Sequence, residues 1–346
     1  MSRSAAALVA VVAFLATACG PGQPTSIPST CCQPSAIPVP LKVGLGYIPS
    51  VQFAPFYYAQ QQGYYDDVGL EVTFENKIDP DLVTLVGQGA LDIGVADGTS
   101  VIPAVSQGIP IRYVATIYGT FPSIVFAKAS SGIATAADLA GRKIGIPGKY
   151  GSSWIMLQAL LSSVGLTPDD VTVVEYPDYG QGVAVQQGVV DAATGFANNE
   201  PVQLAIGSHT PPVAGEEVVV LHVDDVVALP GPGLIAGVAT LDSKVDAVAA
   251  FIAATLRAMT EIAADPEVGL DAAIAAVPEL ANQRETQESI LAATIAIWSS
   301  PAGGGAFGGI DVAGWADSIT LMTGMGLVPN PVTVNDLVRA DLLPAQ

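Results

Sequence analysis

Two short stretches of this sequence recur at almost the same spacing, and that internal repeat narrows the folds open to the chain. Lys42-Val43-Gly44-Leu45 is echoed 101 residues later by Lys143-Ile144-Gly145-Ile146. Gln88-Gly89-Ala90-Leu91-Asp92 is echoed 99 residues later by Gln187-Gly188-Val189-Val190-Asp191. Because the two offsets agree within a small change of loop length, we expect two copies of one structural unit.

Each copy has the pattern of a strand, turn, helix, strand, helix and strand. Gly63 and Gly165 are placed to end the first helix, and Gly89 and Gly188 to end the second. This alternation predicts a parallel sheet with helices on both faces. Ligands of such sheets bind beyond the carboxyl ends of the strands. We therefore expect four strand-end loops to face one cleft: 47–56, 97–100, 147–154 and 196–201.

Beyond residue 240 the apolar residues recur at helical spacing, which predicts helices that pack on one of the two units. The expected helices are 244–264, 272–277, 284–298 and 311–325. Clusters of Pro and Gly near 120–130 and 225–240 predict that the chain crosses between the units there. We expect lobe one to comprise 41–124 plus 238–346, and lobe two to comprise 125–237.

The N-terminus predicts an exported, membrane-anchored protein. Residues 1–18 carry Arg3 and then an apolar run too short to span a bilayer comfortably, which is typical of a signal peptide. The run from Leu15 to Cys19 resembles a bacterial lipobox, so we expect lipidation, including palmitate, at Cys19; plain secretion is the alternative. Residues 19–40 are rich in Pro and Ser and predict a tether. The expected location is extracytoplasmic, on the cell membrane.

The composition excludes several classes of partner. Only 12 Lys and Arg stand against 32 Asp and Glu, a net charge of −20, which would repel nucleic acid and anionic lipid. We expect no nucleic-acid partner and contact with the membrane through the lipid anchor only. Cys31 and Cys32 are the only other cysteines and lack a metal-ligand spacing. We expect no metal and no cofactor.

Several motifs of the chain resemble one known family. They are Gly46-Tyr47-Ile48-Pro49, then Phe53-Ala54-Pro55-Phe56-Tyr57-Tyr58-Ala59-Gln60, then Gly63-Tyr64-Tyr65 and Gly69-Leu70-Glu71-Val72. The Gln-Gly-x-x-Asp echoes and Asp138-Leu139-x-Gly141-x-Lys143-Ile144-Gly145 belong to the same pattern. This resembles the solute-binding proteins related to thiamine-pyrimidine synthesis proteins, over most of residues 41–300.

The resemblance implies a fold and a function. The fold would be α/β, a two-lobed periplasmic-binding-protein fold of type II, with a parallel-rich sheet flanked by helices in each lobe. Members serve ABC importers for thiamine pyrimidine precursors, alkanesulfonates, nitrate and riboflavin. The phrases "YIPSVQFAPFYYAQQQGYY" and "FANNEPVQL" are most similar to members that bind riboflavin. We therefore expect a monomeric receptor that captures riboflavin between its lobes and delivers it to a membrane permease. A thiamine-precursor pyrimidine is the alternative ligand.

A flat heteroaromatic ligand needs aromatic faces for stacking and a few polar groups for its edge. The strand-end loops offer both kinds of side chain. Asn198-Asn199-Glu200-Pro201 follows an apolar strand end, with helix capping by Asn199 as the alternative; the resemblance implies that Glu200 accepts from a ring amine or ring N–H. At Tyr150 to Ser152 a helix N-terminus could hold a ligand oxygen or be capped by Ser152. The candidate ligand-binding residues are Gln52, Phe53, Tyr57, Asp97, Tyr118, Tyr150, Gly151, Ser152, Asn198, Asn199 and Glu200.

Two rival readings have less support. Sulfonate or nitrate would call for cationic donors, and only Arg112 and Lys149 lie near the expected cleft. An extracytoplasmic hydrolase would need a catalytic group, yet His209 and His222 are the only histidines and form no metal pair, and no Gly-x-Ser-x-Gly elbow occurs. The cysteine-rich motif of the pyrimidine-synthesis enzymes is absent as well, since no Cys follows Cys32. We expect a binding protein and no catalytic residues.

Overall fold

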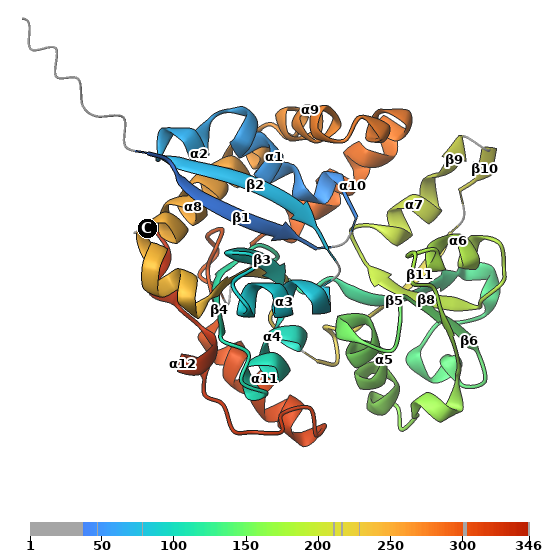
Figure 1. Ribbon diagram of the computed structural model, residues 1–346. Coiled ribbons are helices and arrows are strands. Elements are labelled where there is room, and N and C mark those ends of the chain that lie inside the picture. The colour runs from blue at the N-terminus through green and yellow to red at the C-terminus, as the bar shows by residue number, and fades with distance from the viewer. Residues whose placement is uncertain are drawn as a thin grey trace, which may run out of the picture. The chain divides into compact units, whose positions relative to one another are not determined.

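The computed structural model describes residues 37–46, 48–77, 79–209, 212–215, 217–227, 229–299 and 303–344. The predicted signal peptide, Cys19 and the tether up to residue 36 lie outside the described residues. Residues 37–344 contain two five-stranded sheets, each covered by helices (Figure 1).

The first sheet has the strand order β2-β1-β3-β12-β4. Both β2 and β3 run parallel to β1, whereas β12 runs antiparallel to β3 and β4. The strands are β1 (Val39–Leu45), β2 (Leu70–Asn76), β3 (Ile93–Ala96), β4 (Ile111–Thr116) and β12 (Gly233–Gly237).

The second sheet has the order β11-β5-β8-β6-β7, with β7 and β8 parallel to β6 and with β5 and β11 joined antiparallel. Its strands are β5 (Ser123–Lys128), β6 (Lys143–Ile146), β7 (Thr172–Glu175), β8 (Ala192–Phe196) and β11 (Val218–His222). A separate antiparallel pair is formed by β9 (Gly207–His209) and β10 (Pro212–Ala214).

The internal repeat of the sequence is confirmed by this topology. The order β2-β1-β3 in the first sheet is matched by β7-β6-β8 in the second, with the same parallel directions. The four predicted helix-ending glycines all have positive φ, between 71° and 77°, which a side chain would strain: Gly63, Gly89, Gly165 and Gly188.

The parallel pairings expected from the sequence lie within the repeated unit. The chain leaves the first sheet after β4, enters the second at β5, and returns from β11 to β12. These crossing strands add to the sheets from outside the repeated unit, and all of their pairings are antiparallel. The internal repeat of the sequence therefore did not predict these crossing strands.

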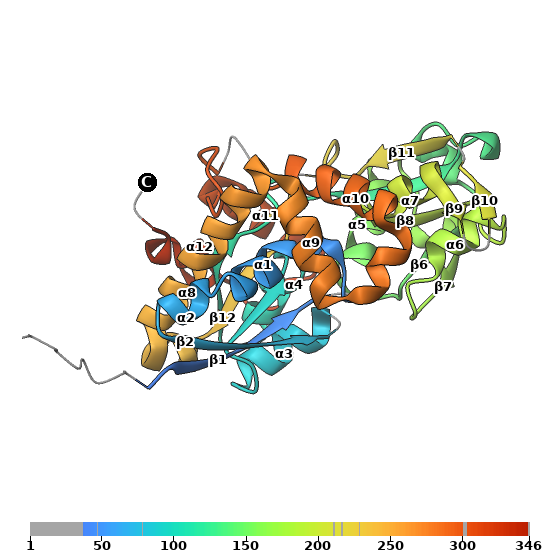
Figure 2. The same ribbon diagram turned by 90° about the horizontal axis from the view of Figure 1, so that it is seen from above.

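Helices cover both faces of each sheet. In Figures 1 and 2, α1, α2 and α8 lie on one side of β1 and β2, and α3 lies on the other. In the second sheet α5 contacts β5 and β8, while α6 and α7 contact β8 as well. The helices of the first part of the chain are α1 (Ala54–Gln61), α2 (Tyr64–Asp67), α3 (Asp79–Gly87), α4 (Gly98–Ser106), α5 (Gly151–Ser163), α6 (Gln181–Gln186) and α7 (Glu200–Ile206). Short 3-10 turns include η1 (Val51–Phe53).

The C-terminal region is helical, as the apolar spacing predicted. Its helices are α8 (Val238–Ala264), α9 (Pro266–Ala276), α10 (Arg284–Ala296), α11 (Val312–Gly324) and α12 (Val334–Leu337). By length and composition α8 could cross a membrane, but 56% of its most apolar stretch is buried within the fold. It therefore serves as a core helix of the first sheet.

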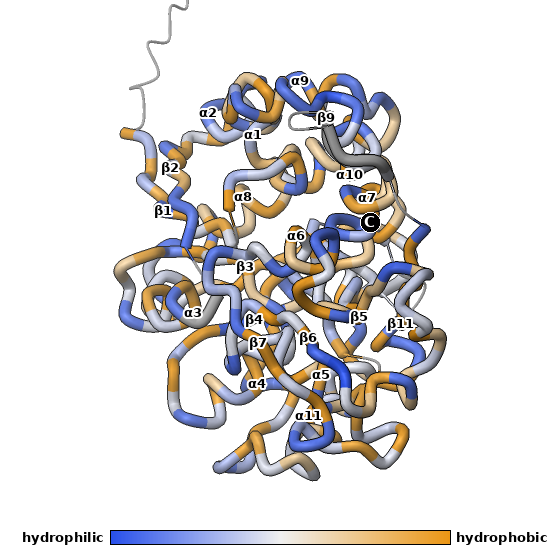
Figure 3. Tube along the Cα trace, turned by 90° about the vertical axis from the view of Figure 1, so that its right-hand side faces the viewer, coloured by the Kyte–Doolittle hydropathy of each residue, from blue (hydrophilic) through white to orange (hydrophobic). Residues whose placement is uncertain are grey.

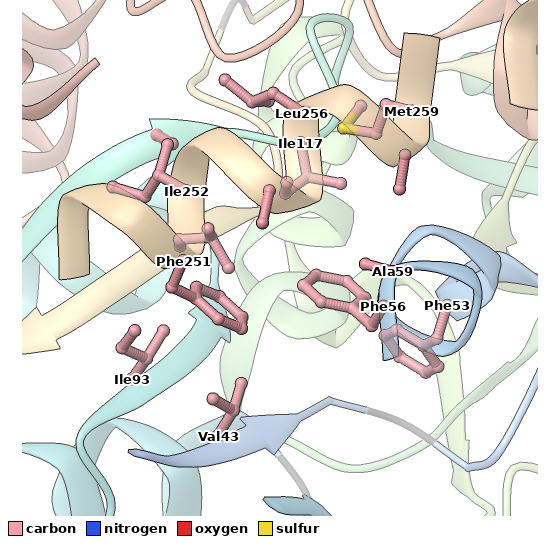
Figure 4. Close-up of a cluster of buried hydrophobic side chains, with 14 of the residues drawn as sticks. Val43, Phe53, Phe56, Ala59, Ile93, Ile117, Phe251, Ile252, Leu256 and Met259 are labelled. Carbon is pink, nitrogen blue, oxygen red and sulfur yellow. The ribbon is translucent and has the colours of Figure 1, made fainter. Parts of the chain in front are cut away.

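The packing of these helices follows from the hydrophilic and hydrophobic residues that each of them combines. Figure 3 shows hydrophilic and hydrophobic residues alternating along the outer helices, including α9 and α11. Figure 4 shows the core that α1 and α8 build over β1, where Phe56 faces Phe251. Their rings are stacked with centroids 6.3 Å apart and planes inclined by 20°. Burial of these side chains holds η1 and α1 in place at the end of β1.

The two repeated aspartates make the same contact in both sheets. The Asp92 carboxylate accepts from the backbone N–H of Lys42 at 2.9 Å, and Asp191 accepts from that of Lys143 at 2.8 Å. Asp92 also accepts from the Thr240 hydroxyl at 3.2 Å and from the Lys244 ammonium at 2.9 Å. Each aspartate ties the turn before the third strand of its unit to the first strand.

We expect Asp191→Ala to lower the free energy of unfolding by about 1 kcal/mol, because it removes one hydrogen bond to a backbone N–H. Asp92→Ala should cost about 2 kcal/mol, because the carboxylate also holds α8. Urea denaturation measures both values, with the exposed Asp169→Ala as the control. Equal losses for all three variants would contradict this role of the repeated aspartates.

Candidate functional site

A cavity lies between the two sheets, at the carboxyl ends of their parallel strands. The first sheet contributes Gly46 beyond β1, Val95 to Asp97 at the end of β3, and Ile117 and Tyr118 beyond β4. The second contributes Pro147 beyond β6 and Gly195 and Phe196 at the end of β8. All four predicted strand-end loops therefore reach one cavity, as the geometry of open α/β sheets requires.

Aromatic side chains line the cavity from both sides. Phe53 and Phe56 come from η1 and α1, which follow β1, and Tyr118 follows β4. The second sheet supplies Phe196, whose ring makes an edge contact with Phe121 at 6.0 Å. The full aromatic lining is Phe53, Phe56, Tyr118, Tyr150, Tyr179 and Phe196. Such faces can stack on a flat ring system.

The Gln52 amide is held by a buried hydrogen-bond network. Its Oε1 accepts from the Tyr118 hydroxyl at 3.2 Å and from Asn198 Nδ2 at 3.1 Å. Its Nε2 donates to Ser50 Oγ at 3.2 Å. Asn198 Nδ2 also donates to Thr294 Oγ1 on α10 at 2.8 Å. Because two donors fix the amide oxygen, the remaining N–H of Nε2 is the group that Gln52 can offer to a ligand.

Glu200 is the first residue of α7 and lies folded back toward the end of β8. Its Oε2 accepts from the backbone N–H of Phe196 at 2.9 Å. Gly195 makes this approach possible, because a Cβ there would lie 2.8 Å from the Glu200 carboxyl carbon and 2.9 Å from the Phe126 ring. The carboxylate is thereby held at the cavity wall.

Burial raises the pKa of Glu200 to about 7, against an ordinary value of 4.5, and the hydrogen bond from Phe196 opposes this rise only partly. No described residue of the cavity wall is Lys, Arg or His, so no cation stabilises the carboxylate there. A carboxyl in this state can accept a hydrogen bond from a ligand that brings a donor.

Asp97 is the N-cap residue of α4 and is almost fully buried, at 3% exposure. It accepts from the backbone N–H of Thr99 at 2.9 Å and from the Thr99 hydroxyl at 2.5 Å. Burial raises its pKa, while these bonds and one from the Ser152 hydroxyl of α5 oppose the rise. Asp97 is therefore a helix cap whose carboxyl lies close to Ser152 of α5.

The candidate residues divide into two groups in the structure. Nine of the eleven line the cavity: Gln52, Phe53, Asp97, Tyr118, Tyr150, Gly151, Ser152, Asn199 and Glu200. Tyr57 does not, because the turn of α1 directs it into the core, where its ring contacts Phe74 at 6.5 Å. Asn198 does not either; it lies behind the wall and binds Gln52 and Thr294.

The helix-capping alternatives raised for two of these residues are not what the structure shows. Asn199 occupies the N-cap position of α7 but makes no capping hydrogen bond, and its Oδ1 instead accepts from Gln203 at 2.7 Å. The N-cap residue of α5 is Tyr150, so Ser152 lies inside the helix. Its hydroxyl is free to reach Asp97.

Twelve of the lining residues were not among the candidates from the sequence, and they include Tyr179, Gln181 and Phe196. Among the described residues, Tyr179 is the only non-glycine with a positive φ, 61°. A side chain in this conformation costs on the order of 1–2 kcal/mol, and such strain concentrates at binding sites. The turn sequence Pro177-Asp178-Tyr179-Gly180 was the available signal.

The model of the family described as "NMT1/THI5 like" matches residues 50–268. The chain belongs to the NMT1/THI5-like family. This membership confirms the resemblance inferred from the motifs around Gly46, Phe53 and Gly63.

Relatives in this family differ in their described activities. The riboflavin-binding protein RibY of Chloroflexus aurantiacus is 32% identical over 344 residues, which is 96% of this chain and 96% of that protein. A 4-amino-5-hydroxymethyl-2-methylpyrimidine phosphate synthase of Aspergillus parasiticus is 28% identical, over 63% of this chain and 65% of the enzyme. The full-length similarity is thus to a binding protein.

Solved structures confirm the fold class. The periplasmic aliphatic sulphonate binding protein SsuA of Escherichia coli superposes with a TM-score of 0.64 at 17% identity, over 87% of this chain and 97% of SsuA. The chain therefore has the two-lobed α/β fold of periplasmic binding proteins.

We expect the free energy of unfolding to fall as the pH rises from 4.5 to about 7, because the folded carboxyl of Glu200 keeps a proton that the unfolded one has lost. This contribution, about 3 kcal/mol, should be absent from Glu200→Gln. Urea denaturation at pH 4.5, 6 and 8 measures it, with the exposed Glu288→Gln as the control. If the difference in the free energy of unfolding between Glu200→Gln and wild type does not widen as the pH rises, that result would contradict the burial of this carboxyl.

Proposed function

We propose that this protein is the solute-binding subunit of an ABC importer and that its ligand is riboflavin. The main support is the cavity itself, which offers aromatic faces, amides and carboxylates, while none of its described lining residues is cationic. The full-length similarity to RibY supports the choice of ligand. The isoalloxazine ring would stack on the aromatic walls, and its polar edge would meet the amides and acids.

The proposed ligand is neutral, and the cavity favours a neutral ligand over an anionic one. Glu200 and Asp97 place two acidic groups at the wall, and both have raised pKa values because they are buried. An anionic ligand such as a sulfonate, a nitrate or a phosphorylated flavin would meet this wall without a compensating cation. The ribityl chain of riboflavin carries no charge and needs none.

Capture would take place by closure of two lobes, 41–124 plus 238–346 and 125–237. Both contribute to the cavity, so a ligand that contacts both stabilises the closed form over the open one. The closed form would then dock on a membrane permease and release the solute. We further propose that the protein acts as a monomer and that lipidation of Cys19 holds it on the outer side of the cell membrane.

The second candidate ligand is a thiamine-precursor pyrimidine. It is supported by the similarity to pyrimidine phosphate synthases, which covers about two thirds of the chain in the Aspergillus parasiticus relative. We propose no enzymatic activity, because the sequence has three cysteines, all at or before Cys32, and so lacks the cysteine-rich motif of those enzymes.

We expect purified protein, freed of carried-over ligand by unfolding and refolding, to quench riboflavin fluorescence saturably, one to one and at submicromolar concentration. Flavin mononucleotide differs by one phosphate and should bind at least about tenfold more weakly, because no described residue of the wall supplies a cation for the phosphate. Fluorescence titration measures both affinities. Refolded protein without quenching would refute riboflavin as the ligand and favour the pyrimidine.

Glu200→Ala should weaken riboflavin binding about tenfold or more without unfolding the protein, because it removes a hydrogen-bond acceptor from the cavity wall. Glu288→Ala, on the exposed face of α10, should leave the affinity unchanged. Circular dichroism checks that both variants are folded. Wild-type affinity in Glu200→Ala would remove Glu200 from the binding site.

A further inference from the structure

Among the described residues that line the cavity, Gln181 alone has a buried polar side-chain atom without a hydrogen-bond partner. Gln181 is the first residue of α6 and follows the strained turn at Tyr179. Its side chain lines the cavity although the residue is only 1% exposed. Gly145 of β6 lies beneath it, since a Cβ at that position would be 3.1 Å from the Gln181 Cβ. The side chain is therefore held by close packing from below.

The hydrogen bonds of Gln181 fix the orientation of its amide. Nε2 donates to the backbone carbonyl of Thr194 at 3.4 Å and to Glu200 Oε1 at 3.5 Å. The Thr194 carbonyl and the Glu200 carboxylate are both acceptors, so an amide rotated by 180° would place its oxygen against two oxygens. The nitrogen must face them, and Oε1 must point elsewhere.

Gln181 Oε1 is buried and has no hydrogen-bond partner among the described residues. Buried acceptors are normally satisfied, and an unsatisfied one in a native structure calls for a missing donor. No described residue donates to Gln181 Oε1 in the structure, and no described residue of the wall is Lys, Arg or His. A donor carried by a molecule in the cavity would satisfy this oxygen.

We propose that Gln181 Oε1 accepts a hydrogen bond from a ring N–H or ring amine of the ligand, so that Gln181 selects heteroaromatic ligands that carry such a donor. The inference rests on the proposed function and specifies how its site reads the ligand. Gln52 offers the opposite polarity from the first sheet, because its oxygen is already occupied by Tyr118 and Asn198. The two amides together require a ligand with a donor at one place and an acceptor at another.

Riboflavin and 3-methylriboflavin test this, because the methyl group replaces the only N–H of the oxidised isoalloxazine ring. Wild type should bind riboflavin at least about tenfold more tightly than the methylated form. Gln181→Met, which keeps the chain length but removes the acceptor, should weaken riboflavin binding about tenfold and bring the two affinities together. Gln187→Met, at the exposed end of α6, is the matched control and should behave as wild type. Thermal unfolding verifies that each variant is folded.

Several outcomes would overturn the inference. A folded Gln181→Met with wild-type affinity would show that the acceptor is satisfied by water. An unchanged ratio between the affinities for the two flavins would show that another group of the protein recognises the ring N–H.

If wild type does not bind riboflavin, the proposed function fails instead. The same test is then made with 4-amino-5-hydroxymethyl-2-methylpyrimidine and its dimethylamino analogue in place of the flavins. Loss of their discrimination in Gln181→Met would support the role of Gln181, and binding of neither compound by wild type would refute it.

Discussion

The site depends on one geometric constraint, which is that the parallel strands of both sheets end at the same interface. Because β1, β3, β6 and β8 point their carboxyl ends there, the residues that follow them are brought together from distant parts of the sequence. The helices α4, α5, α6 and α7 begin at this interface, so their N-terminal residues face the cavity. Duplication of one unit thus creates a two-sided site without a special connection between the copies.

A buried polar network joins the two sides of that interface. Asn198 follows β8 of the second sheet, and its amide contacts Gln52 beyond β1 and Thr294 on α10. Asp97 at the N-cap of α4 and Ser152 of α5 lie close together in the wall of the cavity. Hydrogen bonds in such a shielded setting are directional, so they fix how the amide of Gln52 is presented. Asn198 was expected to touch the ligand, yet its place behind the wall gives it a positioning role.

Three energetically unfavourable features of the protein lie at the same cavity. Glu200 is a carboxyl whose pKa is raised by burial, Tyr179 has a positive φ, and Gln181 carries an unpaired acceptor. Each lowers the stability of the ligand-free protein, and the packed core of α1 and α8 on the first sheet offsets that loss. A ligand with matching polar groups can relieve the unpaired acceptor, which supports a role in binding.

The sequence by itself determined the repeated unit, the succession of strands and helices along it, and the family. Periodicity and glycine positions are local signals, so Gly63, Gly89, Gly165 and Gly188 could be placed at helix ends without a structure. It also indicated the loops of the site, because strand-end residues converge in any open α/β sheet. The antiparallel partners β5, β11 and β12 were not predictable, since they lie outside the repeat.

Only the tertiary structure decided which side chains face the cavity. Phe53 and Tyr57 lie one helical turn apart in the same motif, but packing against Phe74 turns Tyr57 into the core. Gln181 gave no signal at all, because its unpaired oxygen results from contacts with Thr194 and Glu200 that no local pattern encodes.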